Sequence, residues 1–415
     1  MTGSGDRRAA GFKHRTRLGE ARATLREVVP VVSDVETVSI SNGDGAVLAE
    51  TLRAERDVPH YPRAAMDGYA VRASDTFGAS DRSPNVLTVG EGEGGAGKAV
   101  RVHTGSELPS HANAVVMIEQ VESLEEEIEV FDAVAEGENV GPVGEDVSRG
   151  TELYEPGHRL RPSDLGLLKS VGIRSMDVRR PPTVAVIPTG EEVVQEDPGP
   201  GEVVETNGLT VSRLVERWGG EARYRDVVPD DEEKLRAAIE RNLEADILVT
   251  TGGSSVGKRD LTPEIVGALG EVLVHGVAIK PGHPVAIGRI DETPVLLLPG
   301  YPVSCIVNAM QFLRPALRWA SGTELIDPPG VTATLDAKLR SEPGVRTFAR
   351  VQLEGERTTD PDGTAEEPIA VPVSASGAGV LSSVALADGW VQIPESVEGI
   401  PEGETVAVER WEALP

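Results

Sequence analysis

The sequence has very little cysteine, aromatic residue and lysine, and it has no long apolar run. Cys305 is the only cysteine among 415 residues, which excludes an internal disulfide framework and any metal site built from several cysteines, and favours a reducing cytoplasm. No apolar run approaches the ~20 residues of a membrane span, so we expect a soluble protein without a membrane partner. The N-terminal residues are basic but lack the apolar core of a secretory signal.

Positive charge is scarce as well. The chain has 40 basic and 68 acidic residues, a formal net charge of -28, and only seven lysines. The negative electrostatic field of such a chain disfavours nucleic acid as a partner. A surface rich in Asp and Glu and poor in Lys suits a cytosol full of salt, because the Debye length falls to ~3 Å at 1 M salt and screens the self-repulsion. We therefore expect a halophilic, archaeal source.

The first part of the chain contains a helical pattern, then a β-type pattern, then a second helix. A chain of this length is too long for one compact core, so we expect several domains. Residues 16–30 carry apolar side chains at helical spacing, whereas residues 31–147 hold short Val-rich runs between Gly, Asp and Pro clusters, which predicts β-structure. A helix then follows, with Ser163 as its N-cap and Gly172 near its end.

The second part of the chain contains two further sequence patterns. Between residues 181 and 323 strands and helices alternate, and the nearly continuous apolar strands predict a parallel sheet covered by helices on both faces. After "DPPG" at residues 327–330, residues 331–415 return to short strands and turns, which favours a small barrel or sandwich.

The stretch "TTGGSSVGKRD" at residues 250–260 contains the G-x-x-x-x-G-K skeleton of a nucleotide-binding P-loop. A P-loop needs Ser or Thr after its lysine to hold magnesium, and Arg259 stands there instead. Two further glycine turns follow apolar strands, "PTGEE" at 188–192 and "LPGYP" at 298–302. Ligands of doubly wound domains bind at the carboxyl ends of the strands, and glycine turns there admit a phosphate. Loop closure alone is enough to explain a single glycine turn of this kind. Three such turns at one edge of a sheet favour a site for a phosphorylated ligand.

Acids stand beside these turns, namely Glu191, Glu192, Asp230, Asp231 and Asp260. Carboxylates next to a phosphate repel it unless a divalent cation lies between them, and Mg²⁺ takes carboxylates together with phosphate oxygens. In so acidic a chain most of these groups belong to the solvated surface, and the paired aspartates are also good helix caps.

Lys280 in "AIKPGHP" is a cation in a chain that is poor in lysine, and it can hold an anionic group. His283 in the same turn is either a ligand or a turn residue. Asp67 and Thr104 lie in two glycine-containing loops of the β-rich part, where the simpler interpretation is a pair of hairpin turns.

Taken together these stretches resemble the molybdopterin molybdenumtransferase family, the MoeA and gephyrin E-domain type. The resemblance lies in the ordered set "AMDGYA", "RVHTG", "ANAVVMIE", "VGEDVSRG", "PTGEEV", "ETNG", "TTGGSSVGKRD", "AIKPGHPVAIG", "LPGYPVSC" and "LSSVALADG", which spans residues 18 to 395. Any one of these motifs is weak, whereas their order is specific.

The resemblance implies a multidomain α/β fold. An elongated segmental domain would comprise residues 16–46 and 148–180, a β-rich insertion domain residues 47–147, a molybdopterin-binding α/β domain residues 181–328, and a C-terminal β-barrel residues 329–415. It also implies a cytoplasmic homodimer that inserts molybdate into adenylylated molybdopterin with release of AMP, assisted by Mg²⁺. Tungstate is a possible alternative oxyanion, and other cofactor-biosynthesis proteins are candidate partners.

Residue by residue, the resemblance implies four catalytic positions and a metal site. The catalytic positions are Asp67, Thr104, Asp260 and Lys280, and the metal ligands are Glu192, Asp230 and Asp260. The substrate-binding positions are Thr189, Gly190, Thr251, Gly252, Gly253, Ser254, Pro281, Gly282, His283, Pro299, Gly300, Ser304, Arg350, Ser382 and Ser383.

Three positions depart from the family's pattern. His283 replaces a second lysine, which weakens the anion site unless the imidazole is protonated. Tyr301 stands where Asn is usual, and Lys258 where an acid is common. Two other functions stay open: adenylylation of molybdopterin, because the central domain alone resembles that transferase, and a non-catalytic scaffold of gephyrin type.

Overall fold

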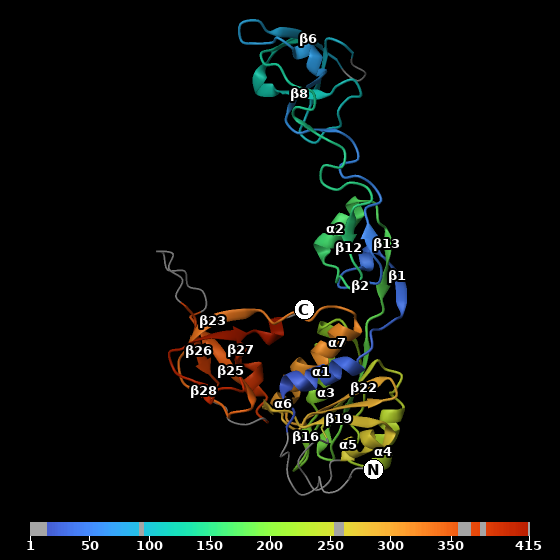
Figure 1. Ribbon diagram of the computed structural model, residues 1–415, viewed down its shortest axis with the longest axis vertical. Coiled ribbons are helices and arrows are strands. Elements are labelled where there is room, and N and C mark those ends of the chain that lie inside the picture. Colours follow the sequence, from blue (N-terminus) through green and yellow to red (C-terminus); the bar gives the residue numbers. More distant parts are fainter. Residues whose placement is uncertain (1–14, 91–94, 253–260, 356–366, 374–378, 414–415) are drawn as a thin grey trace. The chain divides into compact units, whose positions relative to one another are not determined.

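The computed structural model describes residues 15–90, 95–252, 261–355, 367–373 and 379–413. The chain divides into two compact units (Figure 1). Unit 1 comprises Met1–Val35 and Arg179–Pro415, and unit 2 comprises Glu36–Val178. Each unit is a body with its own sheets, so each is described by itself.

The centre of unit 1 is a six-stranded sheet in the order β17-β14-β18-β22-β21-β19. Its strands are β14 (Thr183–Pro188), β17 (Glu221–Tyr224), β18 (Ile247–Thr251), β19 (Glu271–His275), β21 (Ala286–Ile290) and β22 (Thr293–Leu298). The predicted parallel arrangement holds for β17, β14, β18 and β22, whereas β21 and β19 add an antiparallel edge. That edge arises because a short turn at Asp291, whose φ is 50°, folds β21 back onto β22.

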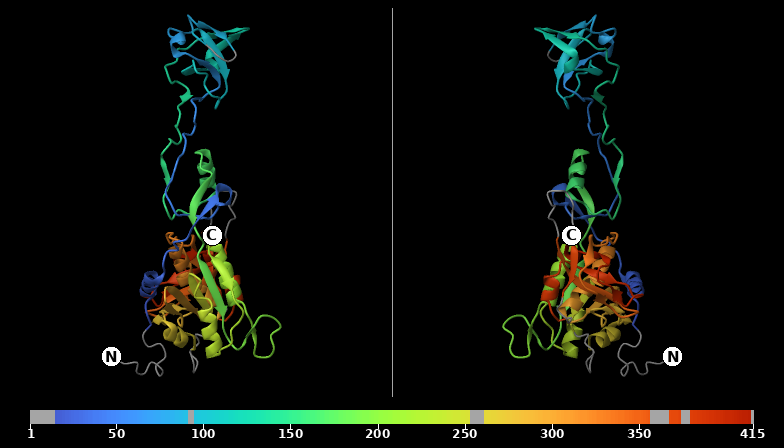
Figure 2. Two further views of the ribbon diagram at one scale, coloured as in Figure 1. Left: turned by 90° about the vertical axis from the view of Figure 1, so that its right-hand side faces the viewer. Right: turned by 90° about the vertical axis from the view of Figure 1, so that its left-hand side faces the viewer.

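Helices cover both faces of this sheet, as the continuous apolar strands predict. They are α1 (Leu18–Val28), α3 (Asn207–Arg217), α4 (Glu232–Glu240), α5 (Leu261–Leu269), α6 (Pro302–Asn308), the π-helical turn η4 (Ala309–Leu313) and α7 (Arg314–Ala320). Alternate strand residues separate the two faces: Val249 and Leu296 pack with α1, α3, α6 and α7, while Leu248 and Leu297 pack with α4 and α5. Two further views show these layers (Figure 2).

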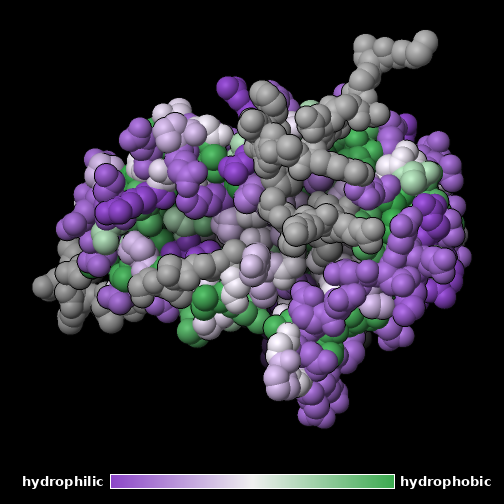
Figure 3. Space-filling model, turned by 90° about the horizontal axis from the view of Figure 1, so that it is seen from below, coloured by the Kyte–Doolittle hydropathy of each residue, from purple (hydrophilic) through white to green (hydrophobic). Residues whose placement is uncertain are grey.

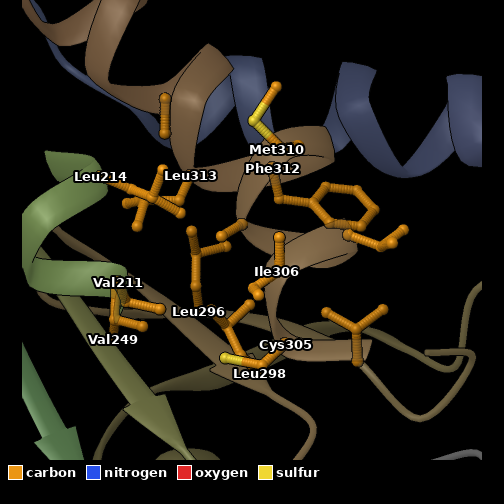
Figure 4. Close-up of a cluster of buried hydrophobic side chains, with 14 of the residues drawn as sticks. Val211, Leu214, Val249, Leu296, Leu298, Cys305, Ile306, Met310, Phe312 and Leu313 are labelled. Carbon is orange, nitrogen blue, oxygen red and sulfur yellow. The ribbon is translucent and has the colours of Figure 1, made fainter. Parts of the chain in front are cut away.

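The cluster under α3 and α6 contains the single cysteine. Val211 and Leu214 of α3 point toward β18 and β22, and Cys305 of α6 lies beside Leu298 (Figure 4). Cys305 is fully buried, and burial raises the pKa of its thiol far above the ordinary value. The helical segment over residues 302–320 contains the π-helical turn immediately before Arg314 and Pro315, which accommodates a proline that cannot donate a backbone hydrogen bond.

The second large part of unit 1 is a closed five-stranded barrel, as the resemblance implies. Its strands are β23 (Gly330–Leu335), β25 (Arg346–Glu354), β26 (Ile369–Pro372), β27 (Gly389–Ile393) and β29 (Thr405–Glu409), and the pairing of β25 with β27 closes it. The short strand β20 (Ile279–Lys280) of the α/β part joins this sheet parallel to β25. Trp390 stacks on Trp411 with ring centroids 5.2 Å apart and belongs to the same core as α1 and α6.

Small elements complete unit 1. They are β15 (Val193–Val194) paired with β16 (Val203–Val204), β24 (Leu339–Arg340) paired with β28 (Gly399–Ile400), α8 (Ser382–Ala385) and the 3-10 turn η5 (Trp411–Ala413). The surface seen in Figure 3 is mostly hydrophilic, with separate hydrophobic patches, in keeping with the acidic composition.

Unit 2 is β-rich, as predicted for residues 31–147. A six-stranded sheet has the order β8-β5-β7-β6-β10-β9. Its strands are β5 (Gly68–Val71), β6 (Asn85–Val89), β7 (Lys98–Val102), β8 (Ala114–Met117), β9 (Val121–Leu124) and β10 (Glu127–Val130). The 3-10 turns η2 (Ala73–Thr76) and η3 (Ile118–Gln120) lie between these strands in the chain.

A second core of unit 2 surrounds α2 (Pro162–Ser170). The strands here are β1 (Val35–Ser39), β2 (Val47–Leu48), β3 (Leu52–Arg53), β12 (Glu152–Tyr154) and β13 (Ser175–Arg179), with the 3-10 turn η1 (Ile40–Asn42). Two further strands, β4 (Arg63–Ala64) and β11 (Val140–Gly141), belong to a separate small cluster with Ala70 and Val102. β13 lies between β1 and β2, β3 pairs with β12, and β4 pairs with β11.

The predicted N-cap of α2 is wrong. The N-cap is Arg161, not Ser163, because the buried carboxylate of Asp164 accepts a hydrogen bond from the Arg161 backbone N–H at 2.9 Å and fixes the first turn two residues earlier. Tyr154 and His158 also bond to Asp164, at 3.0 and 2.8 Å. Burial opposes the charge of Asp164, but the hydrogen bonds outweigh it and hold its pKa well below the ordinary value. Gly172 ends the helix with φ 103°, as predicted.

Among the described residues, no helix is long and apolar enough to cross a membrane.

Candidate functional site

The three glycine turns of unit 1 meet at the carboxyl edge of the central sheet. The register pairs Pro188 with Thr251 and Thr251 with Leu298, so the three strands end side by side. The Thr189 N–H donates to the Thr251 carbonyl at 3.2 Å, and the Gly252 N–H donates to the Leu298 carbonyl at 3.0 Å. The predicted convergence of these turns is therefore present in the structure.

Glycine is required at position 252 by two constraints. Its φ is 125°, and a Cβ there would lie 2.2 Å from the Thr189 carbonyl oxygen. A Cβ on Gly300 would lie 3.5 Å from the Gly252 Cα. The N–H groups of Thr189, Gly190 and Gly252 are used within the protein, so these glycines act mainly by letting the turns approach one another, rather than by supplying free donors to a phosphate.

Two threonine side chains at this edge are buried without a hydrogen-bond partner among the described residues. Thr189 is 2% exposed and Thr251 is 3% exposed, and both hydroxyl oxygens are unpaired in that part of the chain. A buried unpaired hydroxyl costs about 1–3 kcal/mol. These two hydroxyls are therefore available to bond to a polar ligand at this edge.

The start of α3 contributes two residues that the sequence prediction did not include. Asn207 donates from Nδ2 to the Gly300 carbonyl at 2.7 Å and so ties α3 to the third turn. Glu205 is 7% exposed and accepts from the Gly208 N–H at 2.6 Å and from the Tyr224 hydroxyl. Burial and the Glu205 carboxylate raise the pKa of Tyr224 to about 12. The signal was "ETNG", an acid just before a helix that begins at a strand end.

The paired aspartates have different roles. Asp231 is the N-cap of α4 and accepts from the Lys234 N–H at 2.9 Å. Asp230 is half-buried, and burial, then Glu192, then Glu191 raise its pKa above the ordinary value. The structure thus brings together two of the three predicted metal ligands, Glu192 and Asp230. No group of three metal-ligating side chains occurs among the described residues.

Four positions of the glycine stretch, Gly253, Ser254, Lys258 and Asp260, lie outside the described residues. The predictions for them, including the third metal ligand and one catalytic position, stay predictions.

Lys280 lies in β20 and forms an ion pair with Glu342, with Nζ 2.7 Å from Oε1. Both side chains are more than half exposed, at 52% and 61%. The following turn, Pro281 to His283, is tied to α6 because the buried Asn308 donates to the carbonyls of Gly282 at 3.0 Å and Ser304 at 2.8 Å. Lys280 thus precedes a turn that is held against α6, and its ammonium group is paired with the Glu342 carboxylate.

His283 adds no positive charge to this turn near neutral pH. Burial, and then the charge of Arg15, lower the pKa of His283 below its ordinary value of 6.5. Pro299, which precedes Gly300, follows the last residue of β22, Leu298, at the sheet edge.

The barrel positions are placed in detail by their local contacts. Ser383 is buried and donates from Oγ to the Val380 carbonyl at 2.6 Å, whereas Ser382 is exposed. Arg350 lies on β25 opposite Trp390, and burial lowers the pKa of its guanidinium. The Ser383 hydroxyl therefore supports the turn before α8.

The predicted position Ser304 lies outside the barrel, in α6, where it is 3% exposed.

In unit 2 the structure brings Asp67 and Thr104 together. Oδ1 of Asp67 accepts from the Thr104 N–H at 2.7 Å and from its hydroxyl at 2.9 Å. These bonds lower the pKa of the exposed Asp67 carboxyl below its ordinary value. Asp67 precedes β5 rather than a tight Asp-Gly hairpin, and a Cβ on Gly68 would lie 1.9 Å from the Val116 carbonyl oxygen.

Known protein families match the chain in three consecutive regions. Residues 16–172 match the "MoeA N-terminal region (domain I and II)", residues 185–319 the "Probable molybdopterin binding domain", and residues 332–411 the "MoeA C-terminal region (domain IV)".

Individual relatives match along nearly their whole length. A protein of Methanocaldococcus jannaschii named for molybdopterin biosynthesis is 38% identical over 396 residues, which cover 92% of this chain and 94% of that protein. The molybdopterin molybdenumtransferase of Haemophilus influenzae is 30% identical, with 96% and 99% covered. Among solved structures, a molybdopterin biosynthesis MoeA protein from Pyrococcus horikoshii is similar with a TM-score of 0.82 and 37% identity, and 96% and 99% of the two chains are covered.

Proposed function

Because the chain belongs to the MoeA family, we propose that it inserts molybdate into adenylylated molybdopterin and releases AMP, a step of molybdenum cofactor biosynthesis. The observation that carries this proposal is the match, over 96% of this chain and 99% of its relative, to a protein named molybdopterin molybdenumtransferase. The reaction brings together two mutually repelling anions, so positioning and charge are the main tasks of the protein.

The carboxyl edge of the central sheet supplies the polar groups for the phosphorylated pterin. In this proposal the unpaired hydroxyls of Thr189 and Thr251 bond to the substrate, and Gly252 and Gly300 let it approach the backbone. Lys280 holds an anionic group after that group displaces Glu342. The rest of the predicted substrate positions, Gly190, Gly253, Ser254, Pro281, Gly282, His283, Pro299, Ser304, Arg350, Ser382 and Ser383, would line the same region.

The acidic residues at this edge fit a magnesium ion. Burial, and then repulsion by Glu192 and Glu191, raise the pKa of Asp230, and a divalent cation would relieve that repulsion through the hard oxygen donors it prefers. Glu192, Asp230 and Asp260 would hold the ion. When bound, Mg²⁺ neutralises phosphate charge; the carboxylates themselves fix its place beside the turns.

We also propose a homodimer in the cytoplasm at high salt. The net charge of -28 requires screening by salt, and the single buried cysteine fits a reducing compartment. In this proposal Asp67 and Thr104 of a second copy complete the site. Sedimentation in 2 M salt and after dilution would report both the assembly and the salt dependence, and indifference to salt would contradict the halophilic origin.

Adenylylation of molybdopterin is the second candidate, because residues 185–319 alone match a molybdopterin binding domain. The two flanking MoeA regions, which together cover unit 2 and the barrel, favour metal insertion over it.

The deciding experiment incubates purified protein with adenylylated molybdopterin, Mg²⁺ and either molybdate or tungstate at high salt. We expect AMP release that requires the oxyanion. AMP release without any oxyanion would point to hydrolysis, and formation of adenylylated product from ATP and molybdopterin would favour the second candidate. Absence of all three activities, with a relative active in parallel, would overturn the assignment.

A further inference from the structure

Tyr301 is an aromatic residue in an unusual place. It follows Gly300 at the carboxyl end of β22 and is the N-cap of α6, and its side chain makes no capping hydrogen bond. It is 63% exposed, in a chain in which only 3% of residues are aromatic. By contrast Trp218, Phe312 and Trp390 are almost fully buried. A tyrosine normally buries most of its ring, so neither core packing nor capping accounts for this one.

The surroundings of Tyr301 connect it to the candidate site. Its neighbour Gly300 accepts the hydrogen bond from Asn207 and lies against Gly252. On another side, a Cβ added to Gly379 of the barrel would lie 3.4 Å from Cδ1 and 3.7 Å from Cε1 of Tyr301. One edge of the ring therefore lies close to Gly379, before α8, while most of the tyrosine stays exposed at the end of the sheet.

We propose that Tyr301 is a positioning residue whose ring stacks on the planar heterocycle of the substrate. This inference rests on the proposed function, since adenylylated molybdopterin carries two such rings, the adenine and the pterin. Stacking fits the observations because it uses the open face of an aromatic ring and needs no hydrogen-bond partner at the hydroxyl.

The test compares Tyr301→Phe, Tyr301→Ala and Tyr301→Asn in the full-length protein. Binding is measured by calorimetry with AMP alone and with molybdopterin that lacks the nucleotide, so that the two rings are distinguished. We expect Tyr301→Phe to bind like the native protein, and the Ala and Asn variants to bind one of the two ligands about tenfold more weakly. In turnover, the KM for adenylylated molybdopterin should rise while kcat changes less.

Two further variants control this test. Phe77 in unit 2 is also 63% exposed, and Phe77→Ala should leave both affinities unchanged. Gly379→Ala should weaken binding of the same ring much less than Tyr301→Ala does, because its Cβ would meet the tyrosine at ordinary van der Waals distance and leave the ring in place.

Three outcomes would overturn the inference. They are unchanged affinity of Tyr301→Ala for both ligands, a loss in Tyr301→Phe equal to that in Tyr301→Ala, and a change of oligomeric state in Tyr301→Ala, which would assign the ring to a contact between copies. Each leaves the proposed function intact, because that function stands or falls on oxyanion-dependent AMP release by the native protein.

Discussion

The two parts of the predicted site are constructed in different ways. At the sheet edge of unit 1, buried strands bring glycine turns so close that Gly252 has no room for a Cβ. In unit 2, Asp67 and Thr104 meet on an exposed surface through two hydrogen bonds. The first arrangement depends on backbone geometry and the second on two side chains. Substitutions should therefore reduce the stability of the fold more at the sheet edge than in unit 2.

The largest effect is expected for Gly252→Ala. The added Cβ would lie 2.2 Å from the Thr189 carbonyl oxygen at a φ of 125°, so the first two turns must separate. We expect a lower Tm and loss of AMP release. The matched control is Gly267→Ala in the exposed part of α5, where the nearest atom is 3.8 Å away; this change should raise stability by up to ~1 kcal/mol. A Gly252→Ala protein with native activity would contradict the backbone account of this edge.

Asp230→Asn should come next. If Asp230 binds Mg²⁺, its loss should reduce activity at least tenfold, since even partners of metal ligands contribute 10–100-fold. Raising the Mg²⁺ concentration should restore part of the rate. Asp231→Asn keeps a good N-cap on α4 and should leave activity and Tm nearly unchanged. Equal losses of activity in the two variants would show that both aspartates act only at the N-terminus of α4.

Thr251→Val separates stability from binding at the same edge. Removing an unpaired buried hydroxyl should raise the free energy of unfolding by about 1 kcal/mol, while binding of the phosphorylated pterin weakens about tenfold. Ser212→Ala in α3 removes another unpaired buried hydroxyl, away from the turns, and should change stability only. Calorimetry and thermal unfolding measure the two effects. A Thr251→Val protein that binds like the native one would assign its hydroxyl no part in the site.

Glu342→Gln should have a smaller effect of opposite sign. It frees Lys280 from its carboxylate partner, but exposed ion pairs contribute only about 0–1 kcal/mol, so molybdate or phosphate binding should tighten by no more than about fivefold. The gain should shrink as salt rises. Glu398→Gln, at another exposed glutamate of the barrel, provides the control. Weaker anion binding in Glu342→Gln would give the carboxylate a direct role in the site.

Thr104→Val should have the smallest effect on stability. The hydrogen bonds from Thr104 lower the pKa of Asp67 below 3.8 in the folded state, so their contribution is present above pH 3.8 and is lost as the pH falls through the lowered pKa. Losing the hydroxyl should move that pKa back toward 3.8, which NMR titration can follow. Thr88→Val on β6 makes the same change at an exposed position and should leave the Asp67 titration unaltered.

Much of the α/β part could be predicted from the sequence, because long apolar strands and glycine turns carry their own signals. The helix over residues 16–30 is α1, and the three glycine turns meet where the strand-end rule places them. The antiparallel strand β21 was missed because its turn at Asp291 has no glycine or proline. The N-cap of α2 was misplaced because Asp164 reaches back to Arg161.

The contacts that complete the site could not be predicted in the same way. Lys280 and Glu342 are 62 residues apart, and Asn207 and Gly300 are 93 residues apart, so only the folded chain brings them together. The exposure of Tyr301 likewise depends on how the barrel segment at Gly379 meets the sheet. Local patterns identify turns and strands, whereas pairings between distant loops depend on tertiary packing.

The buried thiol of Cys305 gives this protein a built-in probe of its own opening. It is the only sulfhydryl in the chain, and it lies in α6 and packs in the same core as Leu298, the last residue of β22. A thiol reagent can modify it only when that helix lifts from the sheet or the whole unit unfolds. Comparing the labelling rate with and without AMP would therefore measure how much an occupied site slows the separation of α6 from the sheet.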